Sequence, residues 1–365
     1  METFHAILQG ALQSGASDIH LKVDGPVMYR VGRELRRVEA PTPTEAWLAG
    51  VLREIVPPHL QAKLAETHEV DFALALPGQG RFRVNVYQQR GQYSVALRSV
   101  RTAVQSAEQL HLPPIIPQLA ESRRGIVLIT GAPGAGKSTT LAAMLHHLNA
   151  SKRQHIVTLE DPIEYYFEDD QCVIEQREVG LDTMTFRSGL HHVLRQDPDV
   201  LVIGEMRDGA SAQAAVSAAN VGTLVLSTLH TSDAGRSIQR ILEFFPGEER
   251  EVARHQLATT LRAVVSQRLV RTLRGGVVPA MEVMVNTRGV AKLIEQNRLD
   301  QLGAAIELGE GDGMISFERS LTMLLHSGTI SQEEAMLHAP NAESFRMRLQ
   351  GVVLTESKRI IGSRT

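Results

Sequence analysis

Four short hydrophobic runs alternate with helical patterns between Arg123 and His230. The runs lie in GIVLITG (125–131), HIVTLED (155–161), DVLVIGE (199–205) and TLVLSTLH (223–230). Uninterrupted runs of about five apolar residues are typical of strands that are buried on both faces of a parallel sheet. The pattern therefore predicts an α/β domain in this part of the chain.

The first hundred residues have a different pattern. Phe4, Ile7, Leu8 and Leu12 recur at helical spacing, so we expect one amphipathic helix at the start. Strand-like segments follow at residues 17–23, 26–31, 70–76, 80–89 and 93–100, with turn signals between them. The sequence therefore predicts an N-terminal α+β domain over residues 1–100.

Hydrophobic and polar residues alternate strictly in GRFRVNV (80–86). Since successive side chains of a strand point to opposite faces, Phe82, Val84 and Val86 are expected on one face. Arg81 and Arg83 are then expected on the other face.

The Pro-rich stretch HLPPIIPQL (111–119) indicates a boundary, and we predict a linker over residues 101–122. An α/β core is expected over residues 123–280. After about residue 250 the pattern is mostly helical, beginning with EVARHQLATTLRAVVSQRLV (251–270), and we predict a helical C-terminal region over residues 281–365.

Composition narrows the function classes. The chain has 365 residues, a net charge of -3 and one cysteine, Cys172. The near-neutral charge gives no sign of a nucleic-acid partner, and one cysteine excludes a disulfide framework or a Cys-rich zinc site within the chain. No stretch approaches ~18 consecutive apolar residues, so we expect no membrane span. A cytoplasmic location fits these features.

Each of the four hydrophobic runs ends in a polar cluster. In an open α/β sheet, ligands bind beyond the carboxyl ends of the strands, so four separate segments are expected to converge on one site. The first segment matches the G-x-x-x-x-G-K-[ST] phosphate-binding pattern after a strand and before a helix. Its expected nucleotide-binding residues are Gly131, Ala132, Pro133, Gly134, Ala135, Gly136, Lys137, Ser138 and Thr139.

Within this loop, backbone N–H groups and the helix N-terminus are suited to hold phosphates. We expect Lys137 to reach the β- and γ-phosphates of ATP and Ser138 to bind Mg²⁺. Glu164, after the second run, is a candidate for contact with Mg²⁺ or water, although an ordinary acidic loop would look the same.

Glu205 ends the third run and could orient the attacking water and accept its proton. The same carboxylate would also suit a salt bridge to Arg207. Asp199 precedes this run and is expected at the opposite end of the strand. His230, at the fourth strand end, could hydrogen-bond to the γ-phosphate.

Phosphoryl transfer needs a cation for the charge that builds on the γ-phosphate, and an arginine from another domain often supplies it. Arg81 and Arg83 are candidates, although a solvated strand face would look the same.

The motifs together resemble the secretion ATPase superfamily, and specifically its pilus-retraction (PilT/PilU-type) branch. The resemblance is carried by GAPGAGKST, LEDPIEY, QREVGLDT, RQDPDVLVIGEMRD and STLHTSD, with GASDIHL, GRFRVNVYQQR and GMISFERSLTMLLHSGTISQEEAM elsewhere. It implies a PAS-like N-terminal domain and a RecA-like P-loop ATPase domain. It also implies a homo-hexamer at the cytoplasmic side of the type IV pilus base, peripheral to the inner membrane. There the ring would engage an inner-membrane platform protein and drive pilus retraction and twitching motility.

By the same resemblance, Glu160–Glu164 match the family's acidic box, Glu205 its Walker B glutamate and His230 its His box. Arg81 and Arg83 match the N-domain arginines that reach the nucleotide. The extension ATPases carry a tetracysteine zinc motif that one cysteine cannot build, which favours the retraction branch.

One segment departs from the family pattern. The stretch GVAKLIEQ (289–296) stands where PilT-type proteins have AIRNLIRE, and PilU-type proteins also diverge there. Two alternatives to a main retraction motor therefore stay open. The chain could assist a paralogous retraction ATPase, as PilU-type proteins do, or serve as the traffic ATPase of a related secretion or DNA-uptake system.

Overall fold

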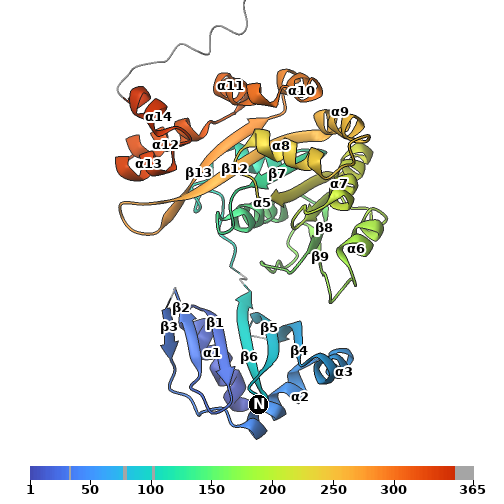
Figure 1. The fold of residues 1–365 in the computed structure, drawn as a ribbon, viewed down its shortest axis with the longest axis vertical. Coiled ribbons are helices and arrows are strands. Elements are labelled where there is room, and N and C mark those ends of the chain that lie inside the picture. The colour runs from blue at the N-terminus through green and yellow to red at the C-terminus, as the bar shows by residue number, and fades with distance from the viewer. Residues whose placement is uncertain (33, 77–79, 101–102, 350–365) are drawn as a thin grey trace, which may run out of the picture. The chain divides into compact units, whose positions relative to one another are not determined.

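The computed structural model describes residues 1–32, 34–76, 80–100 and 103–349, and the chain forms two compact units. One unit comprises Met1–Ala103 with Ile163–Tyr166 and Gly180–Asp182, and the other comprises the remaining segments from Val104 onward (Figure 1). Residues 101–102 of the predicted linker and residues 350–365 of the predicted C-terminal region lie outside the described residues.

The N-terminal unit is α+β, as the sequence predicted. Its six-stranded antiparallel sheet has the order β3-β2-β1-β6-β5-β4 (Figure 1). The strands are β1 (Ala16–Lys22), β2 (Met28–Val31), β3 (Glu34–Arg37), β4 (Glu69–Leu76), β5 (Gly80–Gln89) and β6 (Gln92–Val100). The helices are α1 (Glu2–Gln13), α2 (Glu45–Ile55) and α3 (Pro58–Thr67), and the sequence pattern had not indicated α2, α3 or β3.

The alternation predicted for β5 is confirmed, because Phe82, Val84 and Val86 are at most 1% exposed. They join α1 and the neighbouring strands in one hydrophobic core. The prediction for α1 was wrong at one position. Leu12 is 37% exposed, whereas Ala11 is buried, because Ala11 continues the i, i+3, i+4, i+7 spacing that starts at Phe4.

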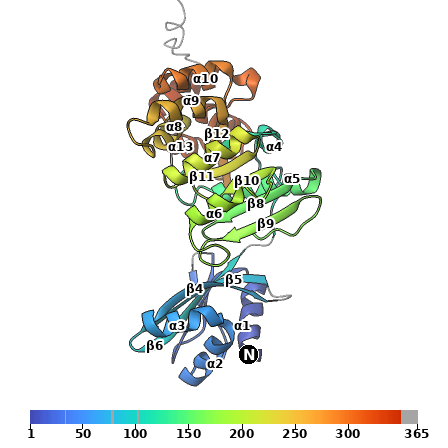
Figure 2. The ribbon, with the colours of Figure 1, turned by 90° about the vertical axis from the view of Figure 1, so that its right-hand side faces the viewer.

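The second unit contains a seven-stranded sheet in the order β13-β12-β7-β11-β10-β8-β9 (Figures 1 and 2). All neighbouring pairs are parallel except β12 and β13. Its strands are β7 (Gly125–Thr130), β8 (His155–Glu160), β9 (Val173–Glu178), β10 (Val200–Ile203), β11 (Leu224–Leu229), β12 (Leu261–Arg271) and β13 (Val277–Val285). The four predicted runs are therefore four consecutive neighbours in the sheet.

Helices connect and cover these strands (Figure 2). They are α4 (Ile115–Ala120), α5 (Lys137–Ser151), α6 (Phe186–Val193), α7 (Gly209–Val221), α8 (Ala234–Glu243), α9 (Arg250–Thr260), α10 (Arg288–Glu295), α11 (Leu302–Leu308), α12 (Phe317–His326), α13 (Gln332–His338) and α14 (Ala342–Leu349), with 3₁₀ turns at Leu299–Gln301 and Glu310–Asp312. Buried residues from α6 to α11 pack with the central strands in one large core.

The helical prediction for residues 251–270 was wrong beyond Thr260. The chain there forms β12, which pairs with β7 on one side and β13 on the other. β13 also extends to Val285, into the region that was predicted to be helical. Val264, Val265 and Val270 are β-branched, which favours a strand, and all three are fully buried. Because successive residues of a strand point to opposite faces, β12 is buried on both faces, whereas a helix at the surface would bury only one side.

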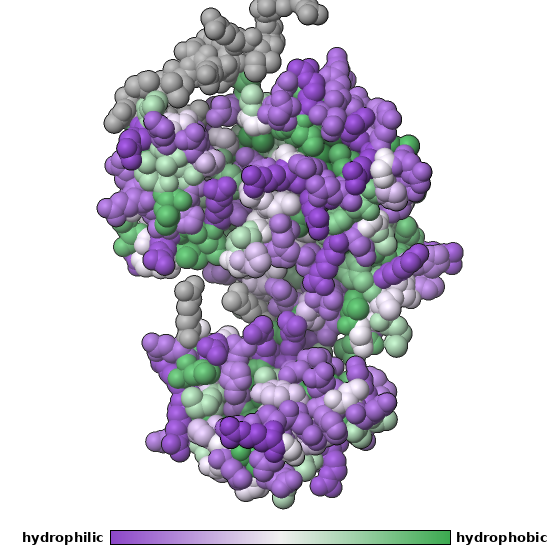
Figure 3. Space-filling view, viewed as in Figure 1, coloured by the Kyte–Doolittle hydropathy of each residue, from purple (hydrophilic) through white to green (hydrophobic). Residues whose placement is uncertain are grey.

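Hydrophilic residues cover most of the face shown in Figure 3, and hydrophobic residues reach the surface in separate places. Within the described ranges, none of the helices combines the length and hydrophobicity needed to cross a bilayer.

Candidate nucleotide site at the strand ends

The predicted site segments meet at one edge of the second sheet. β7, β11, β10 and β8 are consecutive parallel neighbours, so their carboxyl ends lie at the same edge. Backbone hydrogen bonds continue beyond the strands: Gly131 N–H donates to Leu229 O at 3.3 Å and Met206 N–H donates to Thr228 O at 3.0 Å. The loops that follow these strands are thereby held side by side.

The loop between β7 and α5 needs glycine at two positions. Gly131 has φ 151°, and a Cβ there would lie 2.6 Å from the Gln267 carbonyl oxygen. Gly136, the N-cap of α5, has φ 86°, and a Cβ there would meet Gln267 Nε2 at 3.1 Å. Both positions therefore combine a left-handed backbone with close approach to β12.

Gln267 on β12 supports this loop and was not identified from the sequence. Its side chain is 2% exposed, its Nε2 donates to Ala135 O, and its Oε1 accepts from Thr140 Oγ1 at 2.9 Å. One buried amide thus joins the loop to the first turn of α5. No local motif marks Gln267, because its role depends on the pairing of β12 with β7.

Lys137 is 7% exposed and points back into its own loop. Its Nζ donates to Gly131 O at 2.9 Å and Ala132 O at 3.1 Å, and lies 3.1 Å from His230 Nδ1. The lysine of the first strand end and the histidine of the fourth, which are 93 positions apart, are therefore in direct contact.

His230 also contacts the third strand end. Its Nε2 lies 3.1 Å from Glu205 Oε1. An ammonium group can only donate and a carboxylate can only accept, so the two neighbours select one tautomer of a neutral imidazole. In that tautomer Nδ1 accepts from Lys137 and Nε2–H donates to Glu205.

Glu205 makes the salt bridge that the sequence also allowed. Its Oε2 lies 2.8 Å from Arg207 Nη2, and Arg207 Nη1 lies 3.4 Å from Asp161 Oδ2 after β8. The Glu205 carboxylate beside it raises the pKa of Arg207. The contacts with Arg207 and His230 use different oxygens of Glu205, so one does not exclude the other. The strand ends are thus linked in the order Lys137, His230, Glu205, Arg207 and Asp161.

The other predicted residues lie as follows. Ser138 is the second residue of α5 and is partly buried, and Glu160 accepts from Thr158 Oγ1 at 2.7 Å. Asp199 accepts from His155 N–H at 2.9 Å at the amino ends of β8 and β10, as predicted.

Glu164 belongs to Ile163–Tyr166, which groups with the N-terminal unit. Arg81 and Arg83 are on the polar face of β5 in that unit and are partly exposed. The predicted roles of these three residues in a nucleotide site stay predictions.

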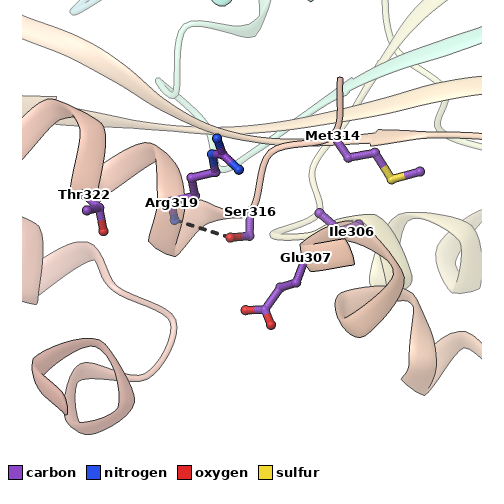
Figure 4. A pocket seen from close by; sticks show the side chains of 6 residues that line it. All are labelled: Ile306, Glu307, Met314, Ser316, Arg319 and Thr322. Atoms are coloured by element: carbon purple, nitrogen blue, oxygen red, sulfur yellow. Dashed lines mark hydrogen bonds between the residues drawn. The ribbon is translucent and has the colours of Figure 1, made fainter. Parts of the chain in front are cut away.

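A separate open pocket of about 330 Å³ lies between α11 and α12 (Figure 4). It is lined by Ile306, Glu307, Met314, Ser316, Arg319 and Thr322. Ser316 caps α12 by accepting from Arg319 N–H at 3.3 Å, so this part of the lining is explained by helix capping.

Comparison with protein families shows which family this chain belongs to. Residues 1–292 match the model of the family described as type II/IV secretion system protein. The chain belongs to this family. The predicted membership of the secretion ATPases, with an N-terminal domain and a RecA-like P-loop domain, is thereby confirmed.

Among relatives of this secretion ATPase, the type IV pilus retraction ATPase PilT of Pseudomonas aeruginosa is 38% identical over 339 residues, covering 93% of this chain and 98% of PilT. The type IV pilus ATPase PilU of the same organism is 36% identical over 352 residues, covering 95% of this chain and 91% of PilU. The crystal structure of the pilus retraction motor PilT with bound ADP is 36% identical, has a TM-score of 0.86 and covers 93% of this chain and 98% of that chain. These similarities confirm the retraction branch that the motifs indicated.

Substituting Gln267 by Ala should weaken nucleotide binding about tenfold, because the Ala135 carbonyl and the Thr140 hydroxyl lose a buried partner. Equilibrium titration with a fluorescent ADP analogue measures the effect. Gln239→Ala, at an exposed position on α8, is the matched control. An unchanged Kd in Gln267→Ala would show that this side chain does not support the loop.

Proposed function

We propose that this chain hydrolyses ATP to drive retraction of a type IV pilus. The observation that carries the proposal is the direct linkage of Lys137, His230 and Glu205 at three strand ends. A glycine loop alone indicates only phosphate binding, whereas a lysine, a histidine and a carboxylate in contact indicate a site for cleaving the γ-phosphate bond. The similarity to PilT along almost the whole chain supports the pilus as the object of the motor.

The linkage suggests how the site would work. Lys137 would exchange part of its contact with loop carbonyls and His230 for the β- and γ-phosphate oxygens. Glu205 would orient the attacking water and accept its proton. Because His230 touches both residues, it would transmit the presence of the γ-phosphate to Glu205.

The metal proposed for this function is Mg²⁺, with Ser138 at the start of α5 and Glu164 in the N-terminal unit as its candidate ligands. The Ser138 hydroxyl and the Glu164 carboxylate are the hard oxygen ligands that Mg²⁺ prefers over nitrogen or sulfur. When bound, the ion would neutralise charge on the β- and γ-phosphates. Ser138 would hold it directly, and Glu164 would contact it or a water.

The further parts of the proposal concern assembly. A homo-hexamer would place the arginine-bearing face of β5 at a nucleotide, where Arg81 and Arg83 would stabilise the charge on the transferred γ-phosphate. The ring would lie in the cytoplasm at the pilus base, peripheral to the inner membrane, and engage a platform protein there.

One alternative within this family rests on a specific observation. Identity to PilU is nearly as high as identity to PilT. In α10 the buried side chains are Val290 and Ile294, and the rest of GVAKLIEQ is at least partly exposed. The two buried positions keep apolar residues, Val290 and Ile294, and the other differences lie at positions that are at least partly exposed. The divergence therefore mainly alters a surface, which would suit a chain that assists a paralogous retraction ATPase. A traffic ATPase of a related secretion system is the other alternative.

Substituting Glu205 by Ala should lower kcat at least about 100-fold while ATP binding is kept, because the residue acts on water and not on the phosphate loop. Phosphate release and nucleotide titration measure the two quantities. Expressed in a host that lacks its own retraction ATPase, the wild-type chain should restore twitching and Glu205→Ala should not. Lys137→Ala is the matched comparison, since it should lose binding as well.

Normal turnover in Glu205→Ala would contradict the proposed chemistry. An active wild-type ATPase that fails to restore twitching alone, but does so beside a second retraction ATPase, would select the assisting role.

Joint substitution of Arg81 and Arg83 by Ala should slow ATP hydrolysis about 10³-fold in the assembled ring, the scale of an arginine finger. Steady-state ATPase assays on protein whose hexameric mass has been verified measure this. Arg36→Ala with Arg37→Ala, on exposed β3, is the control. Turnover unaffected by the Arg81 and Arg83 substitutions would mean that these arginines form only a solvated strand face.

A further inference from the structure

Three polar side chains form a row across the edge of the sheet beside the phosphate loop. Thr130 on β7 is in register with Ser266 on β12, and Ser266 is in register with Glu282 on β13. Thr130 Oγ1 donates to Ser266 Oγ at 3.0 Å, and both residues are 0% exposed. Ser266 lies directly opposite Glu282 in the antiparallel pair of β12 and β13, and its hydroxyl acts to lower the pKa of that carboxyl. The row therefore runs from the residue before Gly131 to Glu282.

The row ends on α8. Glu282 Oε1 accepts from the backbone N–H of Ala234 at 2.9 Å, and Ala234 is the first residue of that helix. Asp233 caps α8 through a different group, the N–H of Arg236, at 2.9 Å. Since only three residues separate His230 from Ala234, Glu282 holds the segment that carries His230.

The two faces of β12 thus serve different parts of the site. Gln267 contacts Ala135 and α5, whereas its neighbour Ser266 points to the opposite face, toward Glu282 and α8. One strand therefore supports the phosphate loop from one side and the histidine segment from the other.

We propose that Glu282 is a positioning residue for ATP hydrolysis, which holds the start of α8 against the Thr130–Ser266 row and so fixes His230 relative to Lys137 and Glu205. This inference rests on the proposed ATPase function. It concerns the geometry of the site and assigns Glu282 no contact with the nucleotide.

The charges around Glu282 support such a role. Burial raises the pKa of Glu282 to about 7; the Ala234 N–H and the Ser266 hydroxyl act to lower it, as does Arg268 on β12, and Asp233 acts to raise it. Burial lowers the pKa of Arg268, and Arg236 on α8 also acts to lower it. Burying a carboxylate costs free energy. If this position only filled space, a hydrophobic side chain there would make the folded protein more stable. The Ala234 N–H uses the acceptor oxygen that Glu282 provides.

Glu282→Ala and Glu282→Gln distinguish positioning from mere stability. Glu282→Ala should lower kcat about 10- to 100-fold, the scale of a misplaced catalytic group, while the Kd for ATP stays within about twofold of wild type. Glu282→Gln keeps an acceptor oxygen and should restore most of the loss. Glu248→Ala, at an exposed position after α8, is the control and should match wild type.

The pH profile provides a second readout. The charged carboxylate is the stronger acceptor for the Ala234 N–H, so kcat of the wild type should rise as pH increases through about 7. Relative to Glu282→Gln, which does not titrate, the wild type should therefore show an additional inflection there.

Wild-type kcat in Glu282→Ala would overturn the inference, as would equal impairment of the Ala and Gln variants with a parallel loss of ATP affinity. Wild-type protein without ATPase activity would instead overturn the proposed function, and the inference with it.

Discussion

Parallel pairing of β7, β11, β10 and β8 is the constraint on which the candidate site depends. These strands are far apart in sequence, yet their carboxyl ends share one edge because each runs in the same direction beside its neighbour. The hydrophobic runs therefore do more than build a core. Their burial fixes where Lys137, Glu205 and His230 leave the sheet, and the contacts between these side chains follow from that placement.

The strand ends alone would not give a rigid site. Glycines let a loop approach phosphates closely, but they also give the loop more conformational freedom, so it needs support from outside. β12 supplies it through Gln267 on one face and Ser266 on the other. The same strand thereby connects the phosphate loop, through Glu282, to the helix that follows His230.

The sequence alone was sufficient to identify those features of the fold and the candidate site whose signal is local. The loop from Gly131 to Ser138 and the strand ends at Glu205 and His230 were identified from short motifs placed on hydrophobic runs, and the alternation of β5 predicted which of its residues are buried. Gln267 and Glu282 were missed for a physical reason. Their roles exist only through the pairing of β12 with β7 and β13, and residues 251–270 have apolar positions that also fit a helix. For Glu205, the sequence offered catalysis or a salt bridge to Arg207 as alternatives, whereas the structure shows that the salt bridge leaves the second carboxylate oxygen to His230.

The most direct measurement is a structure of this chain with Mg²⁺ and a non-hydrolysable ATP analogue. We expect the phosphates in the loop from Gly131 to Ser138, with Lys137 Nζ about 3 Å from β- and γ-phosphate oxygens and His230 still in contact with Glu205. Phosphates bound away from this loop, with Lys137 still on the Gly131 and Ala132 carbonyls, would contradict the proposal that these strand ends form the hydrolytic site.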